Sequence, residues 1–379
     1  MELNEIRNKI NDVDREITRL FETRMELVSE VADYKAKNNL PIFDGSRERE
    51  IIARITENQS DEMAGYTKVL FTTLFDLSRS YQNRNWFLNS GTANDIKNAI
   101  ANTPQLFPKS AVVACQGIEG ANSQLACDRI FSRPKIMYMN SFESVFSAVD
   151  KGLCRYGILP IENSLYGSVT EVYDLMKKYK FYIAKSVKVR INHTLLAKSG
   201  TKISDLKEIF SHEQALGQCS EFLKSLCGVK ITPCENTAVA AKMVFESDRH
   251  DIAAISSKSC AELYNLVPIC SDIQNSDNNY TRFICISKSM EIYPGSNKIS
   301  LMFTIPHRPG SLYGIISRFS ALGVNLTKLE SRPISGTDFE FMFYIDLDAS
   351  IYSDEILNLI CGMSAGPEYF AFLGNYSEI

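Results

Sequence analysis

The sequence predicts a multidomain protein in which an all-α domain is followed by an α/β domain and then by a small α+β domain. Its 379 residues are too many for one hydrophobic core, so two or three domains are expected. Apolar residues recur at helical spacing over the first part of the chain, whereas short β-type runs alternate with amphipathic helices from Ala111 onward. The predicted domains are residues 1–86, 110–290 and 298–379, with a connector at 87–109.

Composition and charge exclude several classes of protein. Apolar residues make up 45% of the chain and charged residues 23%, which is typical of a water-soluble globular protein. The net charge of −4 gives no basic excess, so no nucleic-acid partner is expected. The ten cysteines form no CxxC pair and the four histidines are scattered, so we expect no metal and no cofactor. The charged N-terminal segment and the absence of long apolar runs predict a cytoplasmic protein without a membrane partner.

Residues 1–39 are predicted to form one long helix. Its apolar residues follow steps of three and four, which is the pattern of a heptad seam. At 1.5 Å per residue the helix would be roughly 55–60 Å long, more than a small domain can cover, so a second copy of the chain is the expected partner. Two more helices are expected at 47–58 and 65–86. We therefore predict a homodimer and leave open whether dimers pair into tetramers. The seam consists of Leu3, Ile6, Ile10, Val13, Ile17, Leu20, Leu27 and Val31.

A cation interrupts this seam. Arg24 lies between Leu20 and Leu27, where an apolar residue is expected, and a buried guanidinium is costly unless an anion meets it. Lys35 follows eleven residues later and points within about 20° of Arg24. The simpler interpretation is a coiled-coil seam with one polar residue that sets specificity. Further polar residues on the next two helices favour a pocket for a small dicarboxylate instead.

The segments IRNKI, LFETRMELVSEVADYK, DGSRERE and LSRSYQ resemble the bacterial all-helical chorismate mutase family over nearly all of residues 1–85. The resemblance implies that the arginines hold the substrate carboxylates, with Arg7 supplied by the partner chain. It also implies that Lys35 and Gln82 hydrogen-bond the ether oxygen as catalytic residues. The implied mutase site consists of Arg7, Arg24, Lys35, Asp44, Arg47, Glu48, Ser78 and Gln82.

Short polar motifs punctuate the α/β region where strands give way to loops and helices. Strand ends and helix N-termini are where open α/β sheets bind ligands, and free N–H groups there favour anions. Each motif alone is also explained by helix caps and tight turns. Thr281-Arg282-Phe283 is the exception, because an arginine between apolar strand residues needs a partner.

Together, IENSLYGSV, SHEQALGQC and NYTRF resemble prephenate dehydratases over about residues 110–287. The resemblance implies two α/β subdomains, similar to periplasmic binding proteins, around a cleft. It further implies that Thr281 donates a proton or hydrogen bond to the leaving hydroxyl, while Arg282 and backbone N–H groups near Asn163 bind carboxylate. Asn122 departs from the usual aromatic residue at its position. The implied dehydratase site consists of Ser123, Glu162, Asn163, Ser164, Ser211, Gln218, Thr281, Arg282 and Phe283.

After a second connector at Tyr293–Asn297, the chain reads strand, helix, strand, strand, helix, strand, which predicts a ferredoxin-like unit. The turn GSLY and the segment ESRP can each be read as ordinary helix-entry or edge-strand chemistry. As a pair they resemble the ACT domain of feedback-regulated dehydratases, with Ser311 in place of the usual alanine. The implied phenylalanine site consists of Gly310, Ser311, Leu312, Tyr313, Glu330, Ser331, Arg332 and Pro333.

Three functional readings remain open on these grounds. The leading one is a bifunctional enzyme that takes chorismate to prephenate and prephenate to phenylpyruvate, with phenylalanine as the allosteric effector. The second is a monofunctional dehydratase whose degenerate helical domain only dimerises. The third is a non-catalytic regulator that binds an amino acid. The complete set of mutase positions argues against the second reading, and the retained TRF motif argues against the third.

Overall fold

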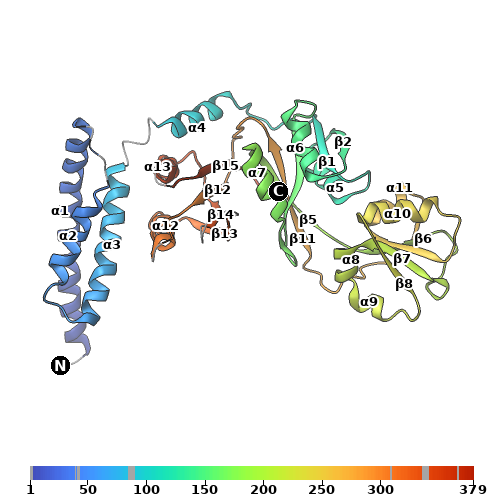
Figure 1. Cartoon of the computed structure of the whole chain (residues 1–379), viewed down its shortest axis with the longest axis horizontal. Coiled ribbons are helices and arrows are strands. Elements are labelled where there is room, and N and C mark those ends of the chain that lie inside the picture. The colour runs from blue at the N-terminus through green and yellow to red at the C-terminus, as the bar shows by residue number, and fades with distance from the viewer. Residues whose placement is uncertain are drawn as a thin grey trace. The chain divides into compact units, whose positions relative to one another are not determined.

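A computed structural model describes residues 3–38, 40, 43–83, 90–307, 310–334, 341–364 and 367–379 of the chain. The chain divides into two compact units that do not follow its linear order. The first contains 1–98 and 299–372, and the second contains 99–298 and 373–379. Figure 1 gives the element labels used below. Among the described residues, no helix is long and apolar enough to cross a membrane.

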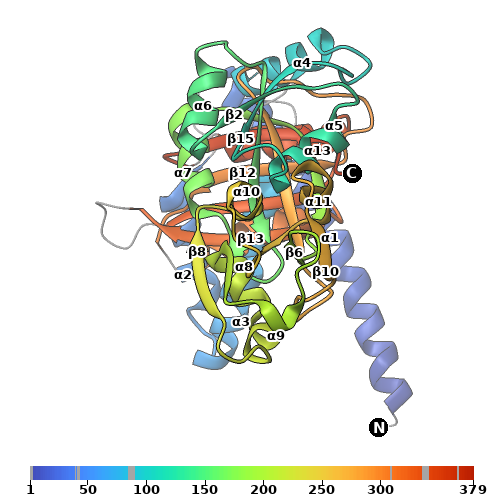
Figure 2. The ribbon, with the colours of Figure 1, turned by 90° about the vertical axis from the view of Figure 1, so that its right-hand side faces the viewer.

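The N-terminal region is all-helical, as predicted. Helix α1 runs without a break from Leu3 to Lys37, and Figure 2 shows its N-terminal part as a continuous coil. At 1.5 Å per residue it is about 52 Å long. Helices α2 (Gly45–Thr56) and α3 (Asp61–Asn83) begin a few residues earlier than expected. The carboxylate of Asp44 caps α2 by accepting from the Arg47 amide at 3.0 Å. Residues 84–86, which the prediction placed in the third helix, lie outside the described residues.

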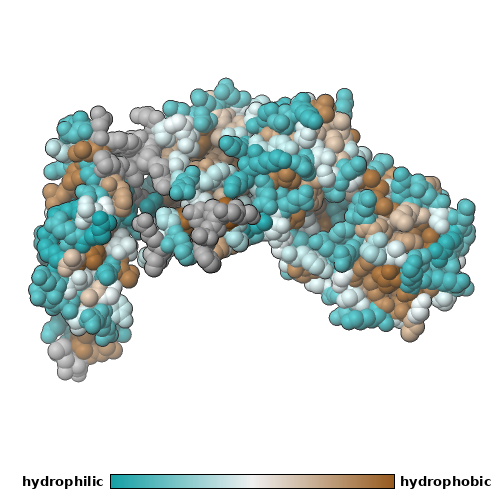
Figure 3. All heavy atoms as spheres, in the orientation of Figure 1, coloured by the Kyte–Doolittle hydropathy of each residue, from teal (hydrophilic) through white to brown (hydrophobic). Residues whose placement is uncertain are grey.

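The seam of α1 lies largely on the surface of the described chain. Its eight apolar side chains are between 41% and 62% exposed, whereas Val28 on another face is buried. Figure 3 shows hydrophobic residues on the visible surface of the helical bundle among polar ones. An apolar stripe of this length would be stabilised by burial against another helix.

The predicted connector contains a helix that the sequence reading missed. Helix α4 runs from Gly91 to Asn102, with the Ser90 hydroxyl accepting from the Ala93 amide at 3.2 Å. Ala93, Ile96 and Ala99 are buried at three-residue spacing. Gly91, Pro104 and Pro108 flank this short helix and are typical of an irregular connector, so the sequence did not indicate it.

The α/β region forms two subdomains, each with its own sheet. The first sheet has the order β2-β1-β3-β11-β5, with β4 paired to β3. The strands β1, β2 and β3 are parallel, whereas β11 runs antiparallel to β3 and β5. Helices α5, α6 and α7 belong to this subdomain. The elements are β1 (Val112–Gln116), α5 (Asn122–Ile130), β2 (Lys135–Met139), α6 (Phe142–Asp150), β3 (Tyr156–Asn163), β4 (Gly167–Ser168), α7 (Thr170–Tyr179), β5 (Tyr182–Arg190) and β11 (Tyr280–Ser287).

The second subdomain lies between β5 and β11 in sequence. Its sheet has the order β10-β6-β9-β7-β8. The chain therefore crosses between the subdomains twice, after β5 and before β11, as Figure 1 shows. The elements are β6 (Thr194–Ala197), β7 (Glu208–His212), α8 (Glu213–Gln218), α9 (Ser220–Lys224), β8 (Lys230–Cys234), α10 (Thr237–Glu246), β9 (Ile252–Ser256), α11 (Lys258–Leu263) and β10 (Val267–Cys270).

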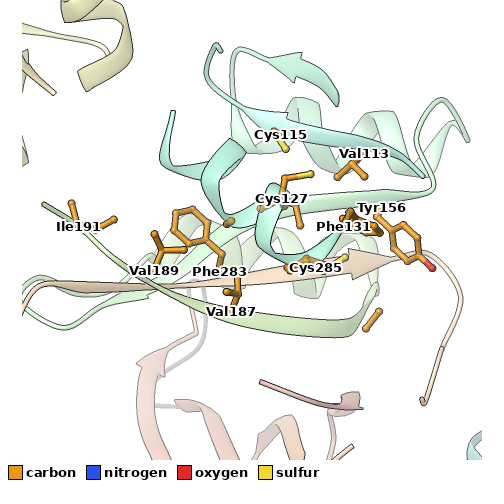
Figure 4. Packing of buried hydrophobic residues seen from close by; sticks show 14 residues of the cluster. Val113, Cys115, Cys127, Phe131, Tyr156, Val187, Val189, Ile191, Phe283 and Cys285 are labelled. Atoms are coloured by element: carbon orange, nitrogen blue, oxygen red, sulfur yellow. The ribbon is translucent and has the colours of Figure 1, made fainter. Parts of the chain in front are cut away.

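A hydrophobic core lies between α5 and the first sheet. Phe283 of β11 packs there with Val187 and Val189 of β5 and with cysteines of α5 and β11. Figure 4 shows these side chains pointing into one cluster. Phe283 is only 3% exposed, so its side chain lies in the core of the first subdomain.

The C-terminal region has the predicted βαββαβ order. The sheet order β13-β14-β12-β15 is that of a ferredoxin-like fold. Gly310 takes the left-handed conformation, with φ of 84°, immediately before α12. The elements are β12 (Lys298–Thr304), α12 (Ser311–Ala321), β13 (Asn325–Pro333), β14 (Phe341–Asp348), α13 (Asp354–Ser364) and β15 (Phe370–Tyr376).

Two strands of this sheet are divided between the two compact units. Lys298 at the start of β12 and residues 373–379 at the end of β15 group with the α/β region. A Cβ on Gly374 would lie 2.4 Å from the carbonyl oxygen of Ile183 in β5, so only glycine permits this approach. The segment after β15 is therefore an integral part of the α/β unit.

Candidate functional site

Asn163, at the end of β3, organises the polar groups at the crossing strands. Its amide nitrogen donates to the Thr281 hydroxyl at 3.0 Å and to the Asn279 side-chain oxygen at 2.9 Å. Its own oxygen accepts from the backbone amides of Leu165 and Tyr166 at 3.0 and 3.1 Å. These bonds hold both ends of the carboxamide and therefore fix where the Thr281 hydroxyl lies.

The network continues into the second subdomain. Asn279 donates to the side-chain oxygen of Gln218 at 3.0 Å, and the same oxygen lies 2.5 Å from Nε2 of His193. All three side chains are buried. An amide oxygen can only accept hydrogen bonds. Nε2 of His193 must therefore be the donor in this contact and carries a proton. Burial lowers the pKa of His193 despite the hydrogen bond to Gln218, and the ring is held neutral.

This network occupies the two segments that cross between the subdomains. His193 follows β5 and Asn279 precedes β11, while Gln218 ends α8. The sequence reading selected Gln218 but neither His193 nor Asn279. Asn279 begins the NYTRF segment and could have been selected from it. His193 stands between Asn192 and Thr194 just before a buried apolar run, and such a polar cluster is typical of an ordinary loop.

The geometry at Thr281 leaves its proton available for another group. A hydroxyl has one proton and two acceptor lone pairs, and the Asn163 N–H occupies a lone pair. The side chain of Thr281 is half-buried. A neutral hydroxyl oriented by an amide can donate to a developing oxygen anion, which is the chemistry expected of this position.

Arg282 makes a different set of contacts from its neighbour. Side chains alternate along a strand, so Arg282 and Thr281 point to opposite faces of β11. The Arg282 guanidinium is 5% exposed, and its Nε lies 2.7 Å from the Glu162 carboxylate. A second carboxylate, that of Glu378, lies 3.8 Å from its Nη1. The structure thus pairs Arg282 with protein carboxylates.

The backbone amides expected to bind carboxylate near Asn163 are already used inside the protein. The amide of Ser164 donates to the Tyr280 carbonyl at 2.8 Å, and the next two amides bond Asn163. That part of the expectation is wrong, because the turn after β3 closes on its own side chain. The Ser164 hydroxyl in turn donates to the Asn278 carbonyl at 2.7 Å.

Two of the predicted serines are engaged within their own subdomains. Ser123 donates to the Gln116 carbonyl beside α5, and Ser211 donates to the Ile255 carbonyl at 2.7 Å. Both are buried. The structure therefore brings Asn163, Thr281 and Gln218 into one hydrogen-bonded network, whereas the hydroxyls of Ser123 and Ser211 bond the main chain.

In the helical region, Arg24 lies against α3. Its Nη1 donates to the Ser78 hydroxyl and contacts the Leu74 carbonyl at 3.4 Å, while the guanidinium lies 6.0 Å from the ring centre of Phe75. Burial lowers the pKa of Arg24. A half-buried guanidinium held only by neutral groups retains affinity for an anion.

Gln82 lies one helical turn beyond Ser78 on α3. Its side-chain oxygen is buried and has no hydrogen-bond partner among the described residues. A buried polar atom without a partner is uncommon and calls for an explanation such as a ligand or an ordered water. Lys35 is half-buried, whereas Arg7 is exposed near the N-terminal end of α1.

Ion pairs hold the start of α2. Arg79 takes part in two of them and was not among the residues predicted from the sequence. Glu48 pairs with Arg79, which also pairs with Asp76. Asp44 accepts from the Arg47 amide and the Ser46 hydroxyl, and these bonds lower its pKa. The Arg47 side chain pairs with the exposed Glu50 at 2.9 Å.

The residues predicted to bind phenylalanine lie on two elements of the ferredoxin-like unit. Gly310 to Tyr313 form the entry to α12, with Tyr313 52% exposed. Glu330 to Pro333 lie on β13, the edge strand of the sheet. Glu330 lies 3.5 Å from Lys328 on the same face of the strand. Among the described residues, no group of His, Cys, Asp and Glu side chains could hold a metal ion.

Comparison with known families matches both catalytic regions. The family model described as prephenate dehydratase matches residues 113–291, and the model described as chorismate mutase type II matches residues 6–83. The chain is 34% identical over 276 residues to arogenate dehydratase/prephenate dehydratase 2 of Arabidopsis thaliana, covering 70% of this chain and 72% of the relative.

Two further relatives extend the comparison. A bifunctional chorismate mutase/prephenate dehydratase of Aquifex aeolicus is 28% identical over 378 residues, covering 100% of this chain and 98% of the relative. The crystal structure of a prephenate dehydratase from Arthrobacter aurescens in complex with L-Phe matches with a TM-score of 0.64 and 26% identity. It covers 70% of this chain and 90% of that chain.

The buried His193 predicts a pH-dependent stability. Its lowered pKa means that the unfolded chain binds a proton below about pH 6.5 more readily than the folded chain, so stability falls as the pH decreases. The His193→Gln variant keeps a donor but cannot titrate. Urea unfolding between pH 5 and 7.5 should show a smaller loss of unfolding free energy in the variant, by up to ~1.4 kcal/mol per pH unit.

The exposed His250 provides the matched control for this measurement. A His250→Gln variant should keep the pH dependence of the wild type. Parallel pH profiles for wild type and His193→Gln would contradict the assignment of a neutral imidazole at position 193.

Proposed function

The chain belongs to the prephenate dehydratase family and carries a type II chorismate mutase domain ahead of it, and from this premise we propose how its sites work. It is a bifunctional enzyme that converts chorismate to prephenate and prephenate to phenylpyruvate, on the route to phenylalanine. The name of the plant relative also includes arogenate. The mutase domain in the same chain favours prephenate, because prephenate is the mutase product.

In the mutase site, the reaction needs no acid, base or nucleophile, because chorismate rearranges in one pericyclic step. The protein can act by holding a compact conformer and by stabilising charge on the ether oxygen. Arg24 supports this role, since neutral groups hold its half-buried guanidinium. We assign Lys35 and Gln82 to the ether oxygen. The buried oxygen of Gln82 has no hydrogen-bond partner among the described residues, and a 180° rotation of the carboxamide would place its N–H₂ at that position. The remaining proposed contacts are Arg7, Asp44, Arg47, Glu48 and Ser78.

In the dehydratase site, the difficult event is departure of the ring hydroxyl as carboxylate is lost and the ring becomes aromatic. The observation that carries the proposal is the hydrogen bond from Asn163 to Thr281, which makes the hydroxyl an acceptor there and leaves its proton to be donated elsewhere. That proton would stabilise the leaving oxygen. Arg282, expected from the sequence to bind the substrate carboxylate, lies on the opposite face of β11 and pairs with Glu162, so we assign it a role in holding the strand. Gln218 joins this site through Asn279, whereas Ser123, Ser164 and Ser211 bond the main chain and Phe283 lies in the core, so these four would support the site from behind.

We propose that phenylalanine inhibits the enzyme through the C-terminal unit. An ACT-like βαββαβ fold and the L-Phe complex of the related dehydratase support this assignment. Gly310 opens α12 in the left-handed conformation and exposes the following turn. Inhibition requires that phenylalanine bind the less active arrangement more tightly.

We further propose that α1 pairs with α1 of a second copy. Its seam exposes eight apolar side chains along one helix, and a mutase site that uses Arg7 of the partner subunit would require the pairing. Sedimentation velocity at micromolar concentration should give a dimer or a larger species. A monomer across that range would contradict the proposal.

The assignment is tested by following both reactions on one preparation. With chorismate supplied, wild type should form prephenate and then phenylpyruvate, and phenylalanine should slow the second step. Thr281→Ala should lower kcat on prephenate by more than about tenfold, because a donor to the leaving oxygen is lost, while mutase turnover stays intact. Thr281→Ser should retain most of the activity.

Different results would favour the other readings. Dehydratase activity without mutase activity would indicate a degenerate helical domain, and absence of both would indicate a regulator. Equal loss of both activities in Thr281→Ala would indicate misfolding and remove Thr281 from its proposed role.

The mutase proposal predicts a change in pH dependence. Gln82 is neutral at every pH, so the wild-type rate should be nearly flat from mildly acid to neutral pH. In Gln82→Glu only the protonated carboxyl can donate, so the rate should fall about tenfold per pH unit above the pKa of that carboxyl. Gln59→Glu, at an exposed position, is the control. An unchanged profile in Gln82→Glu would exclude Gln82 from contact with the ether oxygen.

A further inference from the structure

The segment Ser377–Ile379 lies beside β5 and pairs with it through an isolated parallel β-bridge. The Ser186 amide donates to the Ser377 carbonyl at 3.1 Å, and the Ile379 amide donates to the Ser186 carbonyl at 3.0 Å. The Lys188 amide then donates to the Ile379 carbonyl at 2.9 Å. Ser186 and Glu378 are thus parallel bridge partners. The pairing fixes the position of the Glu378 side chain relative to β5.

Glu378 contacts three cations and a hydroxyl. Its carboxylate lies 3.0 Å from Nζ of Lys188, 3.5 Å from Nζ of Lys298 and 3.8 Å from Nη1 of Arg282. The Ser186 hydroxyl donates to it at 3.2 Å. Burial alone would raise the pKa of Glu378, yet these cations hold it below its ordinary value. The group is therefore a largely buried carboxylate, 15% exposed, that is ionised at neutral pH.

Arg282 and Lys188 carry like charges on adjacent strands, with Arg282 5% and Lys188 55% exposed. They are cross-strand neighbours on β11 and β5, and Glu162 is the neighbour of Arg282 on β3. Two cations directly opposite each other destabilise a sheet. Glu162 neutralises one side of Arg282, and Glu378 lies within reach of both Arg282 and Lys188. Without the Glu378 charge, the buried Arg282 would face repulsion from Lys188 and Lys298.

Lys188, Arg282 and Glu162 are neighbours across β5, β11 and β3, and the backbone connects these charged residues directly to the dehydratase network. Glu162 and Arg282 directly adjoin Asn163 and Thr281 along β3 and β11, and these strands pair Arg282 with Glu162 and Thr281 with Asn163. The register shifts immediately after Arg282. A displacement of Arg282 at this irregular point of the ladder would move Thr281 relative to Asn163.

We propose that Glu378 is a positioning residue of the dehydratase, which acts through Arg282 and Lys188 to hold Thr281 against Asn163. The inference rests on the proposed function of Thr281. Glu378 follows the ferredoxin-like unit in the sequence. It therefore lies outside residues 113–291, which match the dehydratase family.

The test compares full-length wild type with Glu378→Gln, which keeps the shape and removes the charge. We expect kcat on prephenate to fall about tenfold, since small displacements of a reacting group have effects of this order, while KM changes less than about threefold. Mutase turnover in the same molecules should be unchanged. Glu143→Gln is the control, because Glu143 makes an exposed ion pair with Lys178 in the same subdomain.

A second variant separates positioning from folding. In Glu378→Gln combined with Lys188→Met, the anion and one of the opposing cations are both absent, so most of the lost kcat should return. If Glu378→Gln alone fails to fold, the kcat of this double variant is compared with that of wild type instead. An unchanged kcat in Glu378→Gln, or a double variant no better than the single one, would overturn the inference. Absence of dehydratase activity in wild type would instead overturn the proposed function.

Discussion

The antiparallel pairing of β3 with β11 is the constraint on which the α/β half of this enzyme depends. Side chains alternate along both strands, so one register serves two faces at once. On one face it brings Asn163 to the Thr281 hydroxyl, and on the other it pairs Glu162 with Arg282. Chemistry and charge neutralisation are therefore coupled, because neither pair can shift by one residue without exchanging faces with the other.

The helical region follows a different principle. A single chain exposes most of the apolar seam of α1 yet half-buries Arg24 among neutral groups. The exposed seam would be stabilised by packing against an apolar helix, and the guanidinium would be stabilised by binding an anion. Dimerisation and substrate binding would thus satisfy neighbouring parts of one helix.

Periodicity and local motifs were sufficient to predict the domain types. The βαββαβ order and the long first helix have local signals in the sequence, and the motifs place Asn163 and Thr281 in one proposed site, although their hydrogen bond has no such signal. His193 and Glu378 do not, because their roles arise from contacts between segments far apart in the chain. Arg282 shows the same limit, since the sequence indicated that it needs a partner but could not indicate Glu162 and Glu378. Helix α4 was missed because glycine and proline near its ends suggested an irregular connector.

The insertion of residues 373–379 into the α/β unit has a consequence for how the protein is made. Strand β5 leaves the ribosome before the whole of the sequence from β12 to β15, so its parallel neighbour arrives only after the ferredoxin-like unit has been synthesised. Until then the buried Arg282 of β11 and the exposed Lys188 of β5 lack one of their counter-charges. The α/β domain must therefore wait for the end of the chain before its last backbone pairing with β5 can form.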